Sequence, residues 1–311
     1  MPNKIGFLFP GQGAQTVGMG RDFYECFPEA KGIFDQSNLR LDYPLSRICF
    51  EGPEEKLTRT CYAQPAIFVT SLAILAALKT KYPDLEPSFA AGLSLGEFTA
   101  LVAVQSLTFE EGLKLVERRA LAMERSAEHH PGMMASILGL TELACQTLAR
   151  EAGCEIANLN APNQIVLSGT AEGIKKACSL AEAKGAKRAV PLKVGGAFHS
   201  SLMKEAEEDL QKALSEARFQ TPACLFAANV TGQTESQPDQ IRRLLGRQLT
   251  SPVKWDQTMK GAQDEGIDFF LEIGPGKVLK GLVRSNNLDI PVASLSRVED
   301  LEKLEEIFAA S

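Results

Sequence analysis

The chain contains 311 residues, of which 33 are Lys or Arg and 39 are Asp or Glu, so its formal net charge at pH 7 is −6. At 44% hydrophobic and 23% charged residues, the composition is that of a globular protein and excludes a disordered, collagen-like or coiled-coil chain. The acidic balance, without a long run of like charges, also argues against a nucleic-acid-binding protein, which normally contains a basic domain.

Hydrophobic periodicity in the first half predicts alternating strands and helices. In chain order, we expect a strand at 5–9, helices at 18–26 and 64–79, a strand at 88–93, a helix from residue 94 and a helix at 109–127. Pro131 and Gly132 follow the last of these helices and end it, because both residues break helices. The alternation indicates an α/β fold.

The pattern changes after this break. Strands and helices then follow in the order β-α-β-β-α-β, at 133–140, 141–153, 155–162, 163–169, 170–185 and 186–194. This is the order of the ferredoxin-like arrangement. We therefore expect a small ferredoxin-like domain at 127–194, inserted into a larger domain formed by 1–126 and 195–311. The larger domain resumes with a helix at 201–217, a strand at 224–229, helices at 238–248 and 255–265 and a strand at 268–273.

The N-terminus and the cysteines bear on the cellular compartment. The first residues, MPNK, run directly into a strand-like IGFLF and show no signal-peptide pattern. The most apolar stretch, 66–78, is shorter than the roughly 20 residues of a membrane span, so we expect a buried helix and no membrane association. Seven cysteines without a C-x-x-C favour reduced thiols over disulfides or a zinc site. Together these patterns predict a cytoplasmic protein without a bound metal.

Residues 92–96, GLSLG, form a G-x-S-x-G motif between an expected strand and an expected helix. A serine on such a tight turn needs small neighbours, and the turn exposes its hydroxyl beside the N–H groups of the helix N-terminus. Ser94 is therefore a candidate nucleophile. The alternative is a glycine-rich helix start in which Ser94 only caps the helix.

A serine nucleophile needs a base, and the chain has three histidines. His129 and His130 lie in the polar segment SAEHHPG, which is typical of a solvated helix end. His199 lies in VGGAFHSS, where a strand gives way to a helix, a frequent place for a side chain that projects into a cleft. We therefore favour His199 as the base, with a hydrogen-bonded structural histidine as the alternative.

Two glycine-rich segments approach nucleotide-binding motifs without completing them. The segment FPGQGAQ at 9–15 lacks the third glycine of the dinucleotide fingerprint, because Thr16 occupies that position. The segment GPGK at 274–277 is followed by Val278 instead of the Ser or Thr of a P-loop. We expect no nucleotide cofactor, and the first segment remains open as a loop whose Gln12 faces a ligand crevice.

Six segments, in one order along nearly the whole chain, resemble those of the malonyl-CoA:acyl carrier protein transacylase family of type II fatty acid synthesis. They are GQGAQ, GLSLGE, RRALAM, GAFHS, RQLTSPVKW and EIGPGKVL. The resemblance implies an α/β-hydrolase-like larger domain with a ferredoxin-like smaller domain. It also implies malonyl-CoA and acyl carrier protein as substrates, no cofactor and a monomer.

The resemblance assigns roles to particular residues. Ser94 would be the acylated nucleophile, His199 its base, and Gln248 the residue whose backbone carbonyl orients His199. Arg119 would pair with the free carboxylate of the malonyl group, a planar match for a guanidinium. Without the resemblance, Arg119 is more readily a surface residue of the charged run ERRALAMER.

Three further roles come from the resemblance. Gln12 and Leu95 would supply backbone N–H groups to an oxyanion hole, and Asn160 would line the path of the pantetheine arm. The chain departs from the family pattern at Leu93, where the common elbow has histidine, and at Ala120, where glycine usually follows the arginine. We expect activity despite both departures, because alanine is small enough for Arg119 to reach its pocket.

The acyltransferase interpretation has alternatives in other classes. A serine esterase or thioesterase on a related fold would normally have its histidine late in the chain, with an acid between serine and histidine. A non-catalytic carrier-protein-binding module would not need the serine, the histidine and the arginine together. A malonyl or acyl transferase that serves polyketide synthesis is also open.

The resemblance further implies an acidic carrier protein, which would need a local basic surface on a chain whose net charge is −6. Five basic residues near segments expected at the cleft are candidates for this surface: Lys187, Arg188, Lys277, Lys280 and Arg284. The alternative is that they are ordinary solvated charges.

Overall fold

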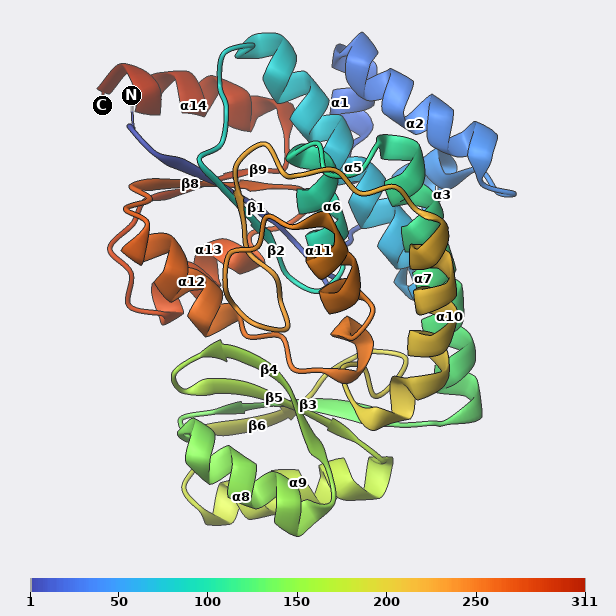
Figure 1. Cartoon of the computed structure of the whole chain (residues 1–311), viewed down its shortest axis with the longest axis vertical. Helices are drawn as coiled ribbons and strands as arrows, with labels where there is room; N and C mark the ends of the chain where they lie inside the picture. The colour runs from blue at the N-terminus through green and yellow to red at the C-terminus, as the bar shows by residue number, and fades with distance from the viewer. Residues whose placement is uncertain (1, 311) are drawn as a thin grey trace.

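The computed structural model describes residues 2–310 and contains two sheets (Figure 1). The larger sheet has the strand order β7-β2-β1-β8-β9, and every neighbouring pair is parallel. Its strands are β1 Ile5–Phe9, β2 Phe89–Gly92, β7 Leu225–Phe226, β8 Phe269–Ile273 and β9 Val292–Leu295. β1 and β8 are buried along their whole length, as expected for a parallel sheet that is covered on both faces.

Helices cover the two faces of this sheet. Phe7 and Phe9 of β1 belong to a core that includes the apolar side chains of α5, whereas Leu8 belongs to a second core with α12 and α13. The helices of this larger body are α1 Arg21–Cys26, α2 Pro28–Arg40, α3 Leu45–Glu51, α4 Glu54–Thr58, α5 Thr60–Lys81, α6 Gly96–Ala103, α7 Phe109–His129, α10 Lys204–Glu216, α11 Pro238–Leu245, α12 Trp255–Asp264, α13 Val278–Ser285 and α14 Val298–Ala310, with short 3₁₀ turns η1 Ser201–Met203 and η2 Gln248–Thr250.

Several of these elements are absent from the sequence prediction: α2, α3, α4, α13, α14 and β9. α3 and α4 have seven and five residues, too few for a helical period to be distinguished from a loop. The strand expected at 224–229 is reduced to Leu225–Phe226, because β7 is an edge strand that pairs with β2 through only two residues.

The smaller sheet is antiparallel, with the order β4-β5-β3-β6, and it packs on its own core with α8 and α9 (Figure 1). Its elements are β3 Met133–Leu138, α8 Glu142–Ala152, β4 Glu155–Ala161, β5 Gln164–Gly169, α9 Ala171–Ala183 and β6 Arg188–Pro191. Thr141 and Thr170 cap the two helices, and Gly153 ends α8 in the left-handed conformation. The order of elements is the one expected from the sequence, although β6 is shorter than predicted.

β4 joins the smaller sheet to the larger body. The backbone N–H of Leu159 donates to the carbonyl of Val253 and the N–H of Val253 donates to the carbonyl of Ala157, both at 2.9 Å. β4 also contacts α12 and α13. The two sheets therefore meet along the segment that links Gln248 to α12.

α5 is the apolar helix predicted around residues 66–78. Among residues 2–310, it is the one helix whose length and hydropathy would allow a membrane span, and 89% of that apolar window is buried within the protein. Its residues pack against α2 and α7. The prediction of a buried core helix is confirmed.

Candidate active site

Ser94 lies on a sharp turn between β2 and α6. Its φ is 53°, a left-handed conformation that a residue other than glycine rarely adopts. A Cβ on Gly92 would lie 1.9 Å from the backbone of Gly96, and a Cβ on Gly96 would lie 2.1 Å from the Phe9 carbonyl oxygen. Both glycines are therefore required for the strand and the helix to approach this closely, and the turn presents the serine at the carboxyl ends of β1 and β2.

His199 lies beside this serine. Its Nε2 is 2.8 Å from Ser94 Oγ, and its Nδ1 is 2.9 Å from the carbonyl oxygen of Gln248. A carbonyl oxygen only accepts hydrogen bonds, so in the neutral ring Nδ1 carries the proton and Nε2 accepts from the serine hydroxyl. Burial, and then the charge of Arg119, lowers the pKa of His199 to about 4. The ring is therefore neutral at neutral pH and can take a proton from Ser94.

Arg119, on α7, is 1% exposed and also reaches the serine. Its Nη2 donates to Ser94 Oγ at 2.9 Å and to Gln248 Oε1 at 2.8 Å, and its Nη1 donates to Gln64 Oε1 at 2.5 Å. Burial lowers the pKa of Arg119 to about 9, and the charge of Glu97 acts in the opposite direction. The guanidinium is thus a buried cation whose hydrogen-bond acceptors are neutral, and it lies next to the reactive hydroxyl.

Gln12 and Leu95 border the same serine from two loops. A Cβ on Gly11 would lie 2.4 Å from the Leu93 carbonyl oxygen, so the loop after β1 lies against the turn that carries Ser94. Gln12 follows β1 in that loop, and its Nε2 donates to Thr60 Oγ1 at 3.2 Å. Leu95 is fully buried and directly follows Ser94.

Asn160 is the predicted site residue that lies apart from the hydrogen-bonded cluster. It is on β4 and 8% exposed, and its carbonyl accepts from Asn286 Nδ2 at 2.8 Å. Across residues 2–310, no hydrogen bond joins it to Ser94 or His199. Its side-chain oxygen is buried without a hydrogen-bond partner. Asn160 therefore lies where β4 meets the residue that follows α13.

Comparison with known proteins places the whole chain in one group. Residues 6–296 match the acyl transferase domain family. The chain is 42% identical over 305 residues to a malonyl CoA-acyl carrier protein transacylase of Bacillus subtilis (strain 168), and the match covers 96% of each protein. The chain belongs to the malonyl CoA-acyl carrier protein transacylase family. This confirms the resemblance drawn from the six sequence segments.

Solved structures of the family agree with this fold. An acyl-carrier-protein-S-malonyltransferase from Bartonella henselae is 36% identical, with a TM-score of 0.93 over 98% of this chain and 99% of that one. A malonyl-transacylase solved in complex with its type II PKS acyl-carrier protein is 33% identical, with a TM-score of 0.94 over 98% of this chain and 100% of that one.

The structure adds three polar residues to the site of this family member that the sequence analysis did not single out: Gln64, Glu97 and Asn229. Gln64 is fully buried on α5 and accepts from Arg119. Asn229 Oδ1 accepts from the Ser94 N–H at 2.7 Å. Gln64 is a polar residue inside the apolar segment YAQPAIF, and this signal could have identified it from the sequence.

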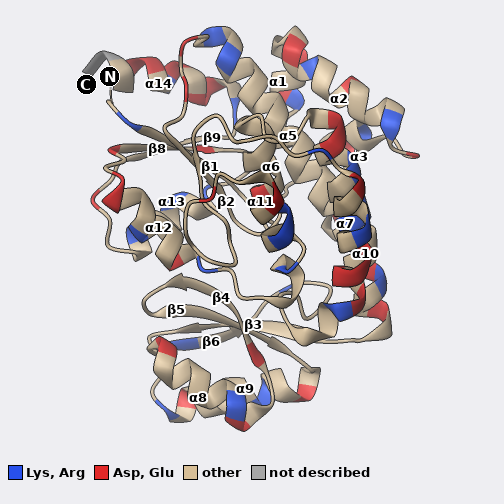
Figure 2. Ribbon diagram, in the orientation of Figure 1, with Lys and Arg blue, Asp and Glu red and all other residues tan. Residues whose placement is uncertain are grey.

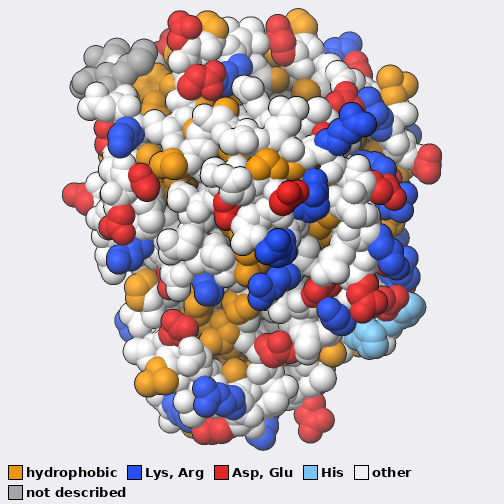
Figure 3. All heavy atoms as spheres, viewed as in Figure 1, with side chains coloured by type: hydrophobic (Ala, Val, Ile, Leu, Met, Phe, Trp, Pro, Cys, Tyr) orange, Lys and Arg blue, Asp and Glu red, His pale blue; other side chains and the backbone are white. Residues whose placement is uncertain are grey.

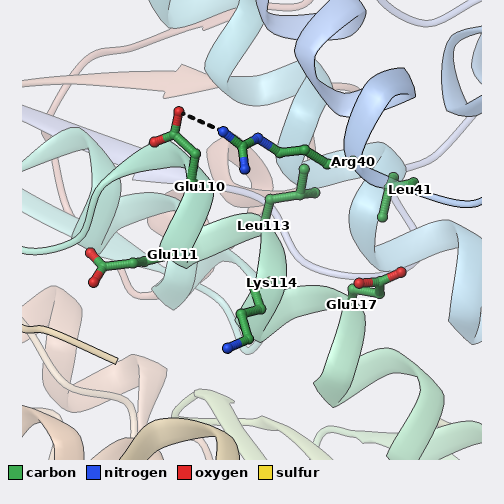
Figure 4. Close-up of a pocket in the computed structure, with 7 residues that line it drawn as sticks. All are labelled: Arg40, Leu41, Glu110, Glu111, Leu113, Lys114 and Glu117. Carbon is green, nitrogen blue, oxygen red and sulfur yellow. Dashed lines mark hydrogen bonds and ion pairs between the residues drawn. The ribbon is translucent and has the colours of Figure 1, made fainter. Parts of the chain in front are cut away.

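A surface pocket of about 320 Å³ lies between α2 and α7 and is distinct from this site (Figure 4). Arg40 Nη2 lies 3.2 Å from Glu110 Oε1 at its edge. Its lining residues are Arg40, Leu41, Glu110, Glu111, Leu113, Lys114 and Glu117. None of these residues is a serine, a cysteine or a histidine, and the pocket contains none of the predicted site residues.

The five basic residues considered for carrier-protein docking fall into two groups. Lys277, Lys280 and Arg284 are exposed at the start and on the surface of α13, which contacts β4. Lys187 and Arg188 lie at β6, the opposite edge of the smaller sheet from β4. The structure does not bring them into one patch. Acidic and basic residues both occur along the helices of the ribbon (Figure 2), and the space-filling view shows red and blue side chains on the same face (Figure 3).

Proposed function

We propose that the chain moves the malonyl group from malonyl-CoA to the phosphopantetheine thiol of acyl carrier protein through a malonyl ester on Ser94, in fatty acid biosynthesis. One observation carries this proposal: Ser94 Oγ lies 2.8 Å from a neutral histidine nitrogen and 2.9 Å from a buried guanidinium. A base and a cation at one hydroxyl fit an acyl substrate that carries a negative charge.

The first half-reaction acylates the serine. Ser94 Oγ attacks the thioester carbonyl carbon while its proton passes to His199 Nε2. The tetrahedral intermediate then collapses, the carbon–sulfur bond breaks, and His199 returns the proton to the CoA thiolate. The Gln248 carbonyl accepts from Nδ1–H throughout, so a backbone oxygen orients the ring where hydrolases use a carboxylate.

The second half-reaction reverses these steps with another thiol. His199 takes the proton of the pantetheine thiol, and the sulfur attacks the malonyl ester carbon. The ester carbon–oxygen bond breaks and Ser94 Oγ recovers its proton from His199. We assign the backbone N–H groups of Gln12 and Leu95 to the oxyanion formed in both halves, because two fixed donors stabilise that charge without a further ion.

Arg119 would bind the malonyl carboxylate. Its direct acceptors, Gln64, Gln248 and Ser94, are neutral, so a substrate carboxylate would be its first directly hydrogen-bonded anionic partner. A guanidinium pairs with a carboxylate through two parallel hydrogen bonds, which selects a dicarboxylic acyl group over acetyl.

The proposal also covers the two domains, the pantetheine path and the cellular setting. We describe the larger body, 1–126 and 195–311, as an α/β-hydrolase-like domain, and 127–194 as a ferredoxin-like domain with the strand order β4-β5-β3-β6. Asn160, at the junction between them, would line the pantetheine path. We further propose a cytoplasmic monomer in which Ser94 and His199 perform the reaction without a cofactor.

Intact mass spectrometry after mixing with malonyl-CoA tests this function. The wild type should gain one malonyl group, and Ser94→Ala should gain none while remaining folded. An equal adduct on both proteins would refute the role of Ser94. Rapid release of free malonate without a thiol acceptor would instead indicate a thioesterase.

A further inference from the structure

Glu97 is a buried acid beside the turn that carries Ser94, and the reaction above does not use it. It is the second residue of α6, three positions after Ser94, and is 1% exposed. Removing a carboxylate from water is unfavourable unless hydrogen bonds or an opposite charge compensate. The hydrogen bonds that Glu97 accepts therefore show how its charge is stabilised and which residues it positions.

The two carboxylate oxygens of Glu97 contact the two residues that fix the serine backbone. Oε2 accepts from Gln248 Nε2 at 2.5 Å, and Oε1 accepts from the backbone N–H of Asn229 at 3.1 Å. Gln248 Nε2 also donates to the Ser94 carbonyl at 2.9 Å, and Asn229 Oδ1 accepts from the Ser94 N–H at 2.7 Å. Glu97 thus anchors both residues that hold the strained turn.

The carboxylate also fixes the orientation of the Gln248 amide. An ionised carboxylate only accepts hydrogen bonds, so the NH₂ group of Gln248 must face Glu97. Gln248 Oε1 then faces Arg119 and accepts from Nη2 at 2.8 Å. A flipped amide would set an oxygen against the carboxylate and an NH₂ group against the guanidinium, which are two repulsive contacts.

Glu97 and Arg119 carry opposite charges on either side of Gln248. Glu97 and Arg119 are both buried, and the Gln248 amide hydrogen-bonds to each of them. Burial raises the pKa of Glu97 to about 7, whereas the hydrogen bonds from Gln248 and Asn229 and the charge of Arg119 lower it. Above this pKa Glu97 is ionised, and the two ions then stabilise each other across one side chain, while Arg119 keeps its direct contacts free of any protein carboxylate.

We propose that Glu97 is a positioning residue that orients the Gln248 amide and, through it, holds the Arg119 guanidinium beside Ser94 for the substrate carboxylate. Glu97 itself contacts neither the acyl group nor the thiol. The inference rests on the proposed function, because it concerns the binding of the malonyl carboxylate. It explains why an acid is buried in a site whose histidine is oriented by a backbone carbonyl.

The test compares Ser94 acylation by malonyl-CoA and by acetyl-CoA in Glu97→Gln. A neutral amide at this position no longer dictates the direction of the Gln248 amide, so Arg119 loses a fixed partner. We expect the malonyl-to-acetyl ratio of kcat/KM to fall about tenfold, the effect of one hydrogen bond to a charged group. Glu272→Gln is the matched control, since Glu272 is also fully buried but accepts from Ser294 Oγ and the Leu279 N–H.

Two further variants separate positioning from folding. In a Gln248→Ala background, which keeps the backbone carbonyl that orients His199, Glu97→Gln should cause no additional loss of selectivity. Glu97→Asp keeps the charge but moves it away from Gln248 by one methylene, so the malonyl-to-acetyl ratio should fall by an intermediate amount. This variant replaces Glu97→Gln in the test if Glu97→Gln does not fold.

Three results would overturn the inference. They are an unchanged malonyl-to-acetyl ratio in Glu97→Gln or Glu97→Asp, an equal loss for both thioesters, or a full additional loss in the Gln248→Ala background. A wild-type protein that forms no malonyl ester on Ser94 would refute the proposed function itself. Normal wild-type acylation with an unaffected ratio would refute only the role of Glu97.

Discussion

At the scale of single residues, the site combines side chains that the sequence reveals to different degrees. Ser94 and His199 stand out locally, because each lies where an expected strand gives way to an expected helix. Arg119 does not, because Arg118 precedes it in the same charged run. The two arginines differ only in the direction in which they project from α7. Arg118 is exposed, whereas Arg119 is 1% exposed and lies beside Val116 and Met123 on the inner face of the helix.

The roles of Glu97 and Asn229 could not be predicted from the sequence, because their partners lie far away along the chain. Asn229 meets the Ser94 N–H across a separation of 135 residues, and Glu97 meets Gln248 across 151. Neither pairing follows from a local period, since both depend on how β2, β7 and η2 converge. Residue type alone therefore predicts the reactive pair but not the side chains that hold it.

Arg119→Ala should lose selectivity for malonyl over acetyl groups. Removing one partner of a buried, hydrogen-bonded charge pair costs about 2–5 kcal/mol, so malonyl-CoA kcat/KM should fall roughly thirty-fold to a few thousand-fold. Acetyl-CoA should lose far less, because it has no carboxylate. Arg119→Lys should restore only part of the rate, since a point charge lacks the bidentate fork. Equal losses for both thioesters would show that Arg119 supports the fold.

The pH dependence of Ser94 acylation should report the low pKa of His199. The base acts when neutral, so the rate should fall as pH drops through about 4, whereas an ordinary histidine would titrate near 6.5. Burial and the charge of Arg119 lower the pKa of His199, and Glu97→Gln leaves both in place, so this variant should keep the acid limb. The measurement is kcat/KM for malonyl-CoA from pH 3 to 8 in the wild type and in Glu97→Gln. The Glu97 carboxyl, whose pKa is about 7, should add a limb near 7 in the wild type only, and a limb near 6.5 that persists in Glu97→Gln would contradict the account.

At the scale of elements, the turn between β2 and α6 depends on glycines that allow close backbone approach. The sequence predicted this turn because G-x-S-x-G is a local motif flanked by strand and helix patterns. It did not predict α13 and β9, which follow the Gly-Pro-Gly segment at 274–276, since such residues commonly mark a loop. In the fold that segment packs against Pro10 and Ala14, and α13 begins two residues later.

Gly92→Ala should disrupt the elbow, because the added Cβ would lie 1.9 Å from the Gly96 backbone. We expect a loss of more than about 3 kcal/mol in the free energy of unfolding, as in overpacked sites, and no acylation of Ser94. Gly32→Ala is the matched control. The added Cβ lies in α2 and meets no atom within 4 Å. The free energy of unfolding of this variant should therefore rise by about 0.5–1 kcal/mol, because alanine is favoured over glycine inside a helix. Urea denaturation of both variants checks the contrast.

At the scale of the whole molecule, the net charge of −6 and the location of the site bear on how a carrier protein approaches. α13 lies between two segments that contain predicted site residues. Gly276, just before it, lies against Ala14 near Gln12, and Asn286, just after it, donates to Asn160. Its three exposed cations therefore lie on a helix that adjoins these segments, whereas Lys187 and Arg188 lie at β6, the far edge of the smaller sheet.

Reversing charge on α13 should weaken use of the carrier protein. For Lys280→Glu with Arg284→Glu, we expect KM for acyl carrier protein to rise several-fold and KM for malonyl-CoA to change little. Lys187→Glu with Arg188→Glu, at the far edge of the smaller sheet, is the control and should have a smaller effect. Attraction of this kind weakens as ionic strength rises, so a carrier-protein KM that is flat with salt would contradict it.

The most direct test of the whole account follows one malonyl group through both half-reactions by intact mass spectrometry. After mixing with malonyl-CoA and removal of free thioester, the protein should carry one malonyl ester, located at Ser94 by peptide mapping. Addition of holo-acyl carrier protein should then move that mass to the carrier within the turnover time. A malonyl ester that is hydrolysed instead of transferred, or a carrier that is loaded without passing through Ser94, would contradict the account.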